Sequence, residues 1–179
     1  MRIISGTHKG KRLRAPKNLP VRPTTDFAKE SLFNILGNRI DIADTKVLDL
    51  FAGTGNISYE FASRGAEDIT AVDQHYGCCK YINATAKELD FNIRVVKSDV
   101  FAFVAKHLES YDLIFADPPY DLGEEAFSNL VTKVLAGDLL AADGILIVEH
   151  PKHLDLSEVP GFFELRRYGG SCFSFYNKK

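Results

Sequence analysis

The sequence predicts an α/β fold built on one mostly parallel sheet, and three features of the chain indicate it. Short apolar runs of strand length alternate with longer segments in which apolar residues recur at helical spacing, an order typical of doubly wound sheets. The run Val47–Leu50 leads into a tight turn at Gly53–Gly55, as a buried parallel strand does before a helix. The last two runs are joined by Gly169-Gly170, which predicts a closing antiparallel hairpin.

The first 22 residues carry a charge of +7 without any acidic residue, although the whole chain has a net charge of −2. Ile3 and Ile4 face Leu13 across a turn, which predicts a small β-hairpin with its basic side chains exposed. Residues Ala15–Pro23 hold three prolines and are expected to form an extended connector. We therefore expect residues 1–23 to form a basic arm and residues 24–179 to form the main domain. Nucleic acid is the usual partner of such an arm.

Helices and strands are expected to alternate through the main domain. Thr24, Thr25 and Asp26 supply capping groups for the first helix, and Gly37 ends it. Apolar runs predict strands at 46–51, 68–72, 93–97, 111–116, 144–149, 162–168 and 172–176, and amphipathic periodicity predicts helices at 27–36, 56–64, 77–88, 100–108 and 124–135.

Polar residues and glycines follow several of the expected parallel strands at the point where each strand ends. The carboxyl ends of such strands open on a common crevice, in which open α/β sheets bind their ligands. Asp73, in particular, stands close to the spacing from the first strand at which nucleotide-binding folds place an acid for ribose hydroxyls. The residues that could line one site are Asp49, Gly53, Gly55, Asp73, Asp99 and Asp117.

A nicotinamide or ATP cofactor is disfavoured by the residues after the Gly53–Gly55 turn. A dinucleotide-binding fold would place a third glycine where Ser58 stands, and the chain has no phosphate-binding lysine of the P-loop type. An oxidoreductase is therefore a weaker hypothesis for this sheet.

The sequence Asp117-Pro118-Pro119-Tyr120 directly follows the expected strand 111–116 and is the most specific pattern in the chain. Proline lacks an N–H and fixes φ near about −65°, so this segment is held extended with its carbonyls free to accept hydrogen bonds. The Asp117 carboxylate and the Pro118 carbonyl form a pair of acceptors suited to an exocyclic amine of a base. Tyr120 offers an aromatic face on which that base could stack.

Composition excludes several other classes of protein. No apolar run approaches the length of a membrane span, and no signal-peptide core follows Met1, so a cytoplasmic protein without membrane contact is expected. The three cysteines lack Cys-x-x-Cys spacing and the five histidines lack ligand spacing, so we expect neither a disulfide framework nor a metal site. The modest length gives no reason to expect more than a monomer.

The chain resembles the bacterial 16S rRNA (guanine(966)-N(2))-methyltransferase family over nearly its full length. A parallel sheet closed by an antiparallel hairpin is also the ending associated with S-adenosylmethionine methyltransferases. The residues that carry the resemblance are Arg2-Ile3-Ile4-Ser5-Gly6 with Lys9-Gly10, Arg22-Pro23-Thr24-Thr25-Asp26, Glu30-Ser31-Leu32-Phe33-Asn34-Ile35-Leu36, Asp49-Leu50-Phe51-Ala52-Gly53-Thr54-Gly55, Ser63-Arg64-Gly65-Ala66 and Asp117-Pro118-Pro119-Tyr120.

The resemblance implies a Rossmann-like class I fold and methyl transfer from S-adenosylmethionine to the N2 amine of a guanine in 16S rRNA, on an assembled or nearly assembled 30S subunit. No metal is needed for that reaction. The implied catalytic residues are Asp117, Pro118, Pro119 and Tyr120. The implied cofactor residues are Asp49, Phe51, Ala52, Gly53, Gly55, Asp73, Gln74, Ser98 and Asp99. The expected RNA contacts are Arg2, Lys9, Lys11, Arg12, Arg14 and Arg22.

In this scheme Asp49 and the two glycines hold the methionine part, Asp73 holds the ribose hydroxyls and Asp99 holds the adenine amine. Two residues depart from the family pattern. Asp73 stands where glutamate is more frequent, and Lys29 stands where arginine is usual, which puts any bidentate contact there in doubt.

Two other functions remain open at this stage. The tetrapeptide Asp117–Tyr120 serves adenine-N6 methyl transfer on DNA or RNA equally well. A non-catalytic ribosome assembly factor that has kept the pocket is the alternative from a different class, and the intact tetrapeptide argues against it.

Overall fold

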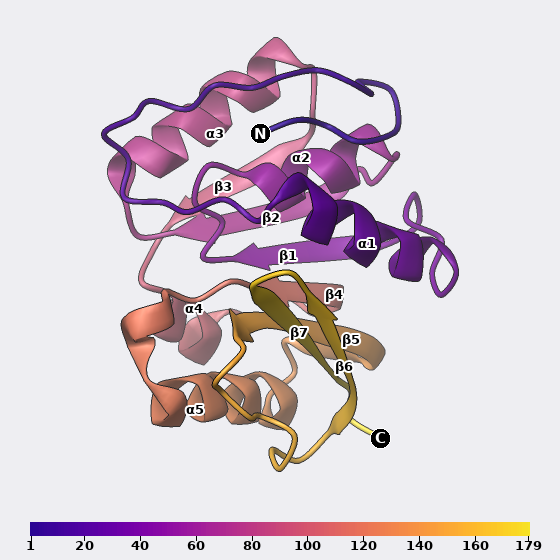
Figure 1. Ribbon diagram of the computed structural model, residues 1–179, viewed down its shortest axis with the longest axis vertical. Helices are drawn as coiled ribbons and strands as arrows, with labels where there is room; N and C mark the ends of the chain where they lie inside the picture. The colour runs from indigo at the N-terminus through magenta and orange to yellow at the C-terminus, as the bar shows by residue number, and fades with distance from the viewer.

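A computed structural model describes residues 1–179 and contains one seven-stranded sheet in the order β3-β2-β1-β4-β5-β7-β6 (Figure 1). The first five strands in sequence are parallel, whereas β7 runs antiparallel to both β5 and β6. The strands span Lys46–Leu50 (β1), Asp68–Asp73 (β2), Ile93–Lys97 (β3), Tyr111–Ala116 (β4), Leu140–Pro151 (β5), Phe162–Tyr168 (β6) and Ser171–Tyr176 (β7). The predicted α/β class and the closing antiparallel hairpin are therefore confirmed.

Helices cover both faces of the sheet. One face carries α1 (Asp26–Gly37), α2 (Asn56–Ser63) and α3 (Tyr76–Glu88), and the other carries α4 (Val100–Lys106) and α5 (Glu124–Ala136). A short 3₁₀ turn, η1, spans Tyr120–Leu122. The main difference from the prediction is β5, which is longer at both ends. None of the helices combines the length and the apolar character needed to cross a lipid bilayer.

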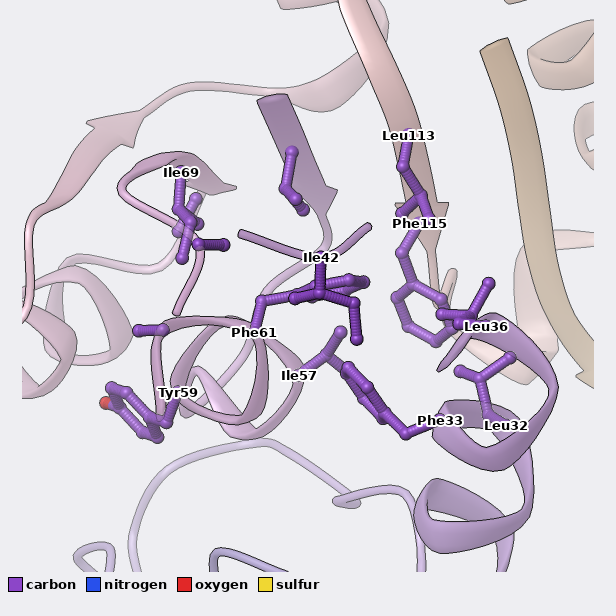
Figure 2. Close-up of a cluster of buried hydrophobic side chains, with 14 of the residues drawn as sticks. Leu32, Phe33, Leu36, Ile42, Ile57, Tyr59, Phe61, Ile69, Leu113 and Phe115 are labelled. Carbon is purple, nitrogen blue, oxygen red and sulfur yellow. The ribbon is translucent and has the colours of Figure 1, made fainter. Parts of the chain in front are cut away.

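The larger hydrophobic cluster lies between α1, α2 and the centre of the sheet (Figure 2). Thr25 caps α1 by accepting a hydrogen bond from the Ala28 amide, at 3.2 Å, which fixes the start of the helix. Phe33 then meets Phe61 of α2 edge to face, with ring centroids 4.6 Å apart, in the same cluster as Phe115 of β4. This packing holds the helices over the carboxyl end of the sheet.

Strand alternation places four acidic residues on the same face of the sheet. Successive side chains of a strand point to opposite faces, and Val47, Ala71, Phe115 and Ile147 all belong to the cluster beneath α1 and α2. The residues two positions further along each strand therefore point to that face as well, at or just beyond the carboxyl ends. These residues are Asp49, Asp73, Asp117 and Glu149.

The first 23 residues lie against the outer side of α2 and α3 (Figure 1, indigo). An antiparallel bridge joins Arg2 and Arg12, and the buried side chains of Ile3 and Leu13 enter the same cluster as α1 and α2. Apolar burial thus attaches this segment to the main domain, while its basic side chains remain exposed.

A buried ion network reinforces that attachment. Lys29, of which only 1% is exposed, donates hydrogen bonds to the Arg2 carbonyl at 2.5 Å and to Asn56 Oδ1 at 2.8 Å. Its ammonium lies 3.4 Å from the carboxylate of Glu60, which in turn accepts the backbone amide of Ile4 at 2.9 Å. Burial lowers the pKa of Lys29, and the charge of Glu60 opposes this shift. Lys29 therefore ties the start of the chain to α1 and α2 through several contacts.

Candidate active site

A cavity of about 910 Å³ opens at the carboxyl end of the sheet, around the point where the strand order reverses between β1 and β4. Ligands of open α/β sheets bind at such a point. The wall combines the connector segment Pro20–Thr25, the turn after β1, the carboxyl ends of β2, β4 and β5, and the start of α4. The segment expected to be a mere connector is thus part of the pocket.

The turn after β1 is held in a conformation that few residues adopt freely. Phe51 has a φ of 58°, in the left-handed region, and Gly53 has a φ of 56°. A Cβ on Gly53 would lie 3.3 Å from Val21, so glycine lets the connector approach the turn closely. Gly55, with a φ of 82°, is required by packing because a Cβ there would lie 2.7 Å from the ring of Tyr59.

Asp49 lines the pocket and is buried, with 2% of the residue exposed. Burial raises the pKa of its carboxyl to about 7, and a 2.6 Å hydrogen bond from Ser58 Oγ partly offsets this effect. The residue that replaces the third glycine of a dinucleotide fingerprint therefore has a role of its own, because it orients this acid.

Most of the other predicted cofactor residues also reach the pocket. Asp73 receives the amides of Gly53 and His75, at 2.9 and 2.8 Å, and Asp99 caps α4 by accepting the Ala102 amide. The cavity wall includes both of these acids and also Phe51, Ala52 and Gln74. The structure does not bring Gly55 and Ser98 to the cavity wall.

Asp117-Pro118-Pro119-Tyr120 lines the cavity at the end of β4, the strand next to β1. The Asp117 carboxylate and the Pro118 carbonyl accept no hydrogen bond from the rest of the chain, so both are available to a ligand donor. Burial, followed by the charges of Glu149 and Asp49, raises the pKa of Asp117 well above its usual range. The Arg22 guanidinium lies 5.5 Å from the ring centroid of Tyr120 and opposes this shift.

Sequence reasoning missed Glu149, which ends the apolar part of β5 and lines the same cavity. Only 3% of this residue is exposed, and Thr24 and Ser171 donate hydrogen bonds to its two oxygens at 2.6 and 2.8 Å. The signal that could have found it is the acid at the end of an apolar run, because Glu149 follows Ile145–Val148 just as Asp117 follows the apolar run of β4.

The six predicted RNA contacts are all exposed, but the structure places them differently. Arg22 lines the cavity, whereas the others lie along the first 14 residues. Arg2 pairs with Asp26 at 3.4 Å, and Lys11 pairs with Glu88 at 3.2 Å. Lys9, Arg12 and Arg14 form no ion pair with the protein and are free to meet an external anion.

The sheet order, the antiparallel β7 and the acid-lined pocket at the switch point define a class I S-adenosylmethionine-dependent methyltransferase. The same fold occurs, with a TM-score of 0.73, in the structure of the Thermus thermophilus 16S rRNA N2 G1207 methyltransferase RsmC with AdoMet and guanosine. The two chains are 21% identical, and the match covers 90% of this chain and 45% of that one.

Sequence comparison defines the family within this class. A family model described as "Conserved hypothetical protein 95" matches residues 1–177. Ribosomal RNA small subunit methyltransferase D of Escherichia coli K12 is 31% identical over 168 residues, covering 93% of this chain and 83% of its own length. YlbH of Bacillus subtilis, provisionally named as an rRNA methyltransferase, is 34% identical over the full length of both chains. The chain belongs to this family, the RsmD-like rRNA methyltransferases.

Proposed function

We propose that the protein transfers a methyl group from S-adenosylmethionine to the N2 amine of a guanine in the 16S rRNA of the small ribosomal subunit. The observation that carries the proposal is the pair of unpartnered acceptors at Asp117 and Pro118, which face a cavity large enough for a cofactor and a base. The full-length resemblance to the guanine-N2 methyltransferase family supports the choice of base.

The residues of the pocket fit S-adenosylmethionine. Asp49 offers a buried carboxylate to the positively charged methionine end, and Gly53 leaves the backbone of the turn open to close approach. Asp73 and Asp99 keep acceptor oxygens for ribose hydroxyls and an adenine amine. The cofactor, when bound, supplies an activated methyl group on a sulfonium that is already a good leaving group.

The chain then has to orient the amine and accept its proton. Asp117 and the Pro118 carbonyl hold the two amine protons, so that the nitrogen lone pair points into the cavity rather than into the aromatic ring. The raised pKa of Asp117 makes its ionised carboxylate a better acceptor for the proton that the nitrogen must lose. Tyr120 supplies a stacking surface, and its hydroxyl lies 3.4 Å from Ser171 Oγ.

The basic segment leads continuously from the surface of α2 and α3 into the pocket wall through residues 20–25. Because this segment is fixed to the main domain, its charges have defined positions relative to Asp117. We infer that Lys9, Arg12, Arg14 and Arg22 contact rRNA phosphates close to the target nucleotide.

The double variant Arg12→Gln/Arg14→Gln is expected to weaken binding to small subunits and to reduce the slope of log K against log salt by about 1.5. These two side chains have no partner in the protein, so they can each neutralise a phosphate. Fluorescence anisotropy over a range of KCl concentrations measures the slope. The control, Lys106→Gln/Lys178→Gln, removes two exposed charges on the side of α4 and the carboxyl terminus (Figure 1). Equal slopes for both variants would show that Arg12 and Arg14 do not contact rRNA phosphates.

The base and the atom that are methylated decide between the proposed function and its nearest rival. Small subunits lacking the modification should yield N2-methylguanosine after incubation with the protein and S-adenosylmethionine. N6-methyladenosine would assign the protein to adenine instead.

A further inference from the structure

Glu149 lies beside Asp117, two residues before the end of the neighbouring strand β5. Ala116 of β4 pairs with Val148 of β5 in parallel register, so the next residues of the two strands, Asp117 and Glu149, follow side by side. Neighbouring strands are about 4.8 Å apart, and both side chains point to the face beneath α1. Both residues line the cavity, so a base whose amine reaches Asp117 lies within reach of Glu149.

The carboxylate of Glu149 is held in a fixed orientation. Thr24 Oγ1 donates to one oxygen at 2.6 Å, and Ser171 Oγ donates to the other at 2.8 Å. Each oxygen keeps a second lone pair, so the group can still accept a proton donor from a ligand. Ser171 also lies 3.4 Å from the hydroxyl of Tyr120, which links this acid to the expected stacking surface.

Two neighbouring acids are costly in a buried site. Burial raises the pKa of Glu149, and its charge contributes to the raised pKa of Asp117. Arg22 is the cation whose charge opposes both shifts. A ligand with two adjacent proton donors would satisfy both carboxylates at once, whereas a ligand with one donor would leave the other carboxylate facing a lone pair.

We propose that Glu149 determines base specificity by accepting the N1–H of the guanine whose N2 amine is held by Asp117 and Pro118. In guanine the N1–H and the N2 amine are adjacent donors on one edge. Adenine presents its N6 amine next to an unprotonated N1, which a carboxylate repels. This assignment rests on the proposed function, because it concerns the base that occupies the same site.

The test compares guanine with 2-aminopurine, which has the same exocyclic amine at C2 but no proton on N1. After the methylated position has been mapped with the wild-type protein, small subunits are reconstituted from 16S rRNA carrying either base there. The wild-type protein should methylate 2-aminopurine at least about 100-fold more slowly than guanine, because the N1–H donor is missing. In Glu149→Gln the amide can donate to N1, so the ratio of the two rates should move about 10- to 100-fold toward 2-aminopurine.

The quantity compared is the ratio of the rates on the two bases, measured separately for each protein. Differences in folded fraction cancel in this ratio, and so do contacts to O6 that are the same in both proteins. Glu125→Gln, an exposed glutamate of α5 without a partner, should keep the wild-type ratio. Thermal denaturation is used to show that the wild type and Glu149→Gln are both folded. If they are, an equal ratio of rates in the two proteins would overturn the assignment. If Glu149→Gln does not fold, the wild-type ratio decides, since equal rates on the two bases would also overturn it. Failure of the wild type to form N2-methylguanosine is a separate result, which removes the proposed function and this assignment together.

Discussion

Replacing Asp117 by alanine should lower methyl transfer to small subunits by about 10²- to 10³-fold, or more, while the Kd for S-adenosylmethionine changes by less than about twofold. Asp117 lines the cavity at the end of β4, which pairs with the strand that carries Asp49, and its carboxylate has no partner within the chain. The proposed role of Asp117 is to hold the amine, so its loss is expected to spare the fold and cofactor binding. Single-turnover transfer of labelled methyl groups and calorimetric titration measure the two quantities.

A matched control separates loss of chemistry from loss of structure. Asp138→Ala removes an exposed carboxylate after α5 that forms no ion pair, so it should retain full activity. If Asp117→Ala kept more than about a tenth of the wild-type rate, the carboxylate would not be the group that holds the amine.

Asp49→Asn should weaken S-adenosylmethionine binding by about 10- to 100-fold at about pH 8, which is the expected effect of losing a charge-assisted contact. In the wild-type protein, affinity should increase as pH rises from about 6 to about 8, because the carboxyl with a pKa of about 7 must ionise to meet the cationic methionine end. The asparagine variant should show no such dependence. A pH-independent wild-type Kd would contradict this role for Asp49.

The same substitution should have the opposite effect on the stability of the protein without cofactor. Burial raises the pKa of Asp49 from 3.8 to about 7, so the folded state holds this proton more tightly than the unfolded state. Stability is therefore lost as pH rises between these two values, and the loss is complete above about 7. Asparagine does not titrate and can still accept the Ser58 hydrogen bond. Asp49→Asn should be about 2–4 kcal/mol more stable at about pH 8 and gain little near about pH 4, as measured by denaturant unfolding.

The arrangement of the sheet could be predicted because its signals are local. Each strand is a short apolar run, each helix has amphipathic spacing, and Gly169-Gly170 forces the final turn. The acids that end the strands could also be predicted to converge, since parallel strands share one carboxyl edge. The same pattern also applies to Glu149, which follows the apolar run Ile145–Val148 of a parallel strand.

Other parts of the site depend on contacts between residues far apart in the sequence. The docking of residues 1–23 depends on Lys29 and Glu60, whose partners are backbone atoms of the first five residues. No local pattern indicates such contacts. The sequence predicted the small hairpin in which Arg2 pairs with Arg12, but not that residues 20–25 of the connector would line the pocket. Gly55 likewise matches a ligand-binding turn in sequence. In the structure, glycine is needed there because a Cβ would collide with the ring of Tyr59.

The most direct test of the proposed function is nucleoside analysis after methyl transfer. Small subunits from a strain that lacks the modification are incubated with the protein and labelled S-adenosylmethionine, with naked 16S rRNA and DNA alongside. The site geometry and the family predict stoichiometric N2-methylguanosine in the 16S rRNA, formed at least about 100-fold more slowly with Asp117→Ala. Label recovered as N6-methyladenosine, or absent from every substrate while the cofactor still binds, would contradict the proposed function.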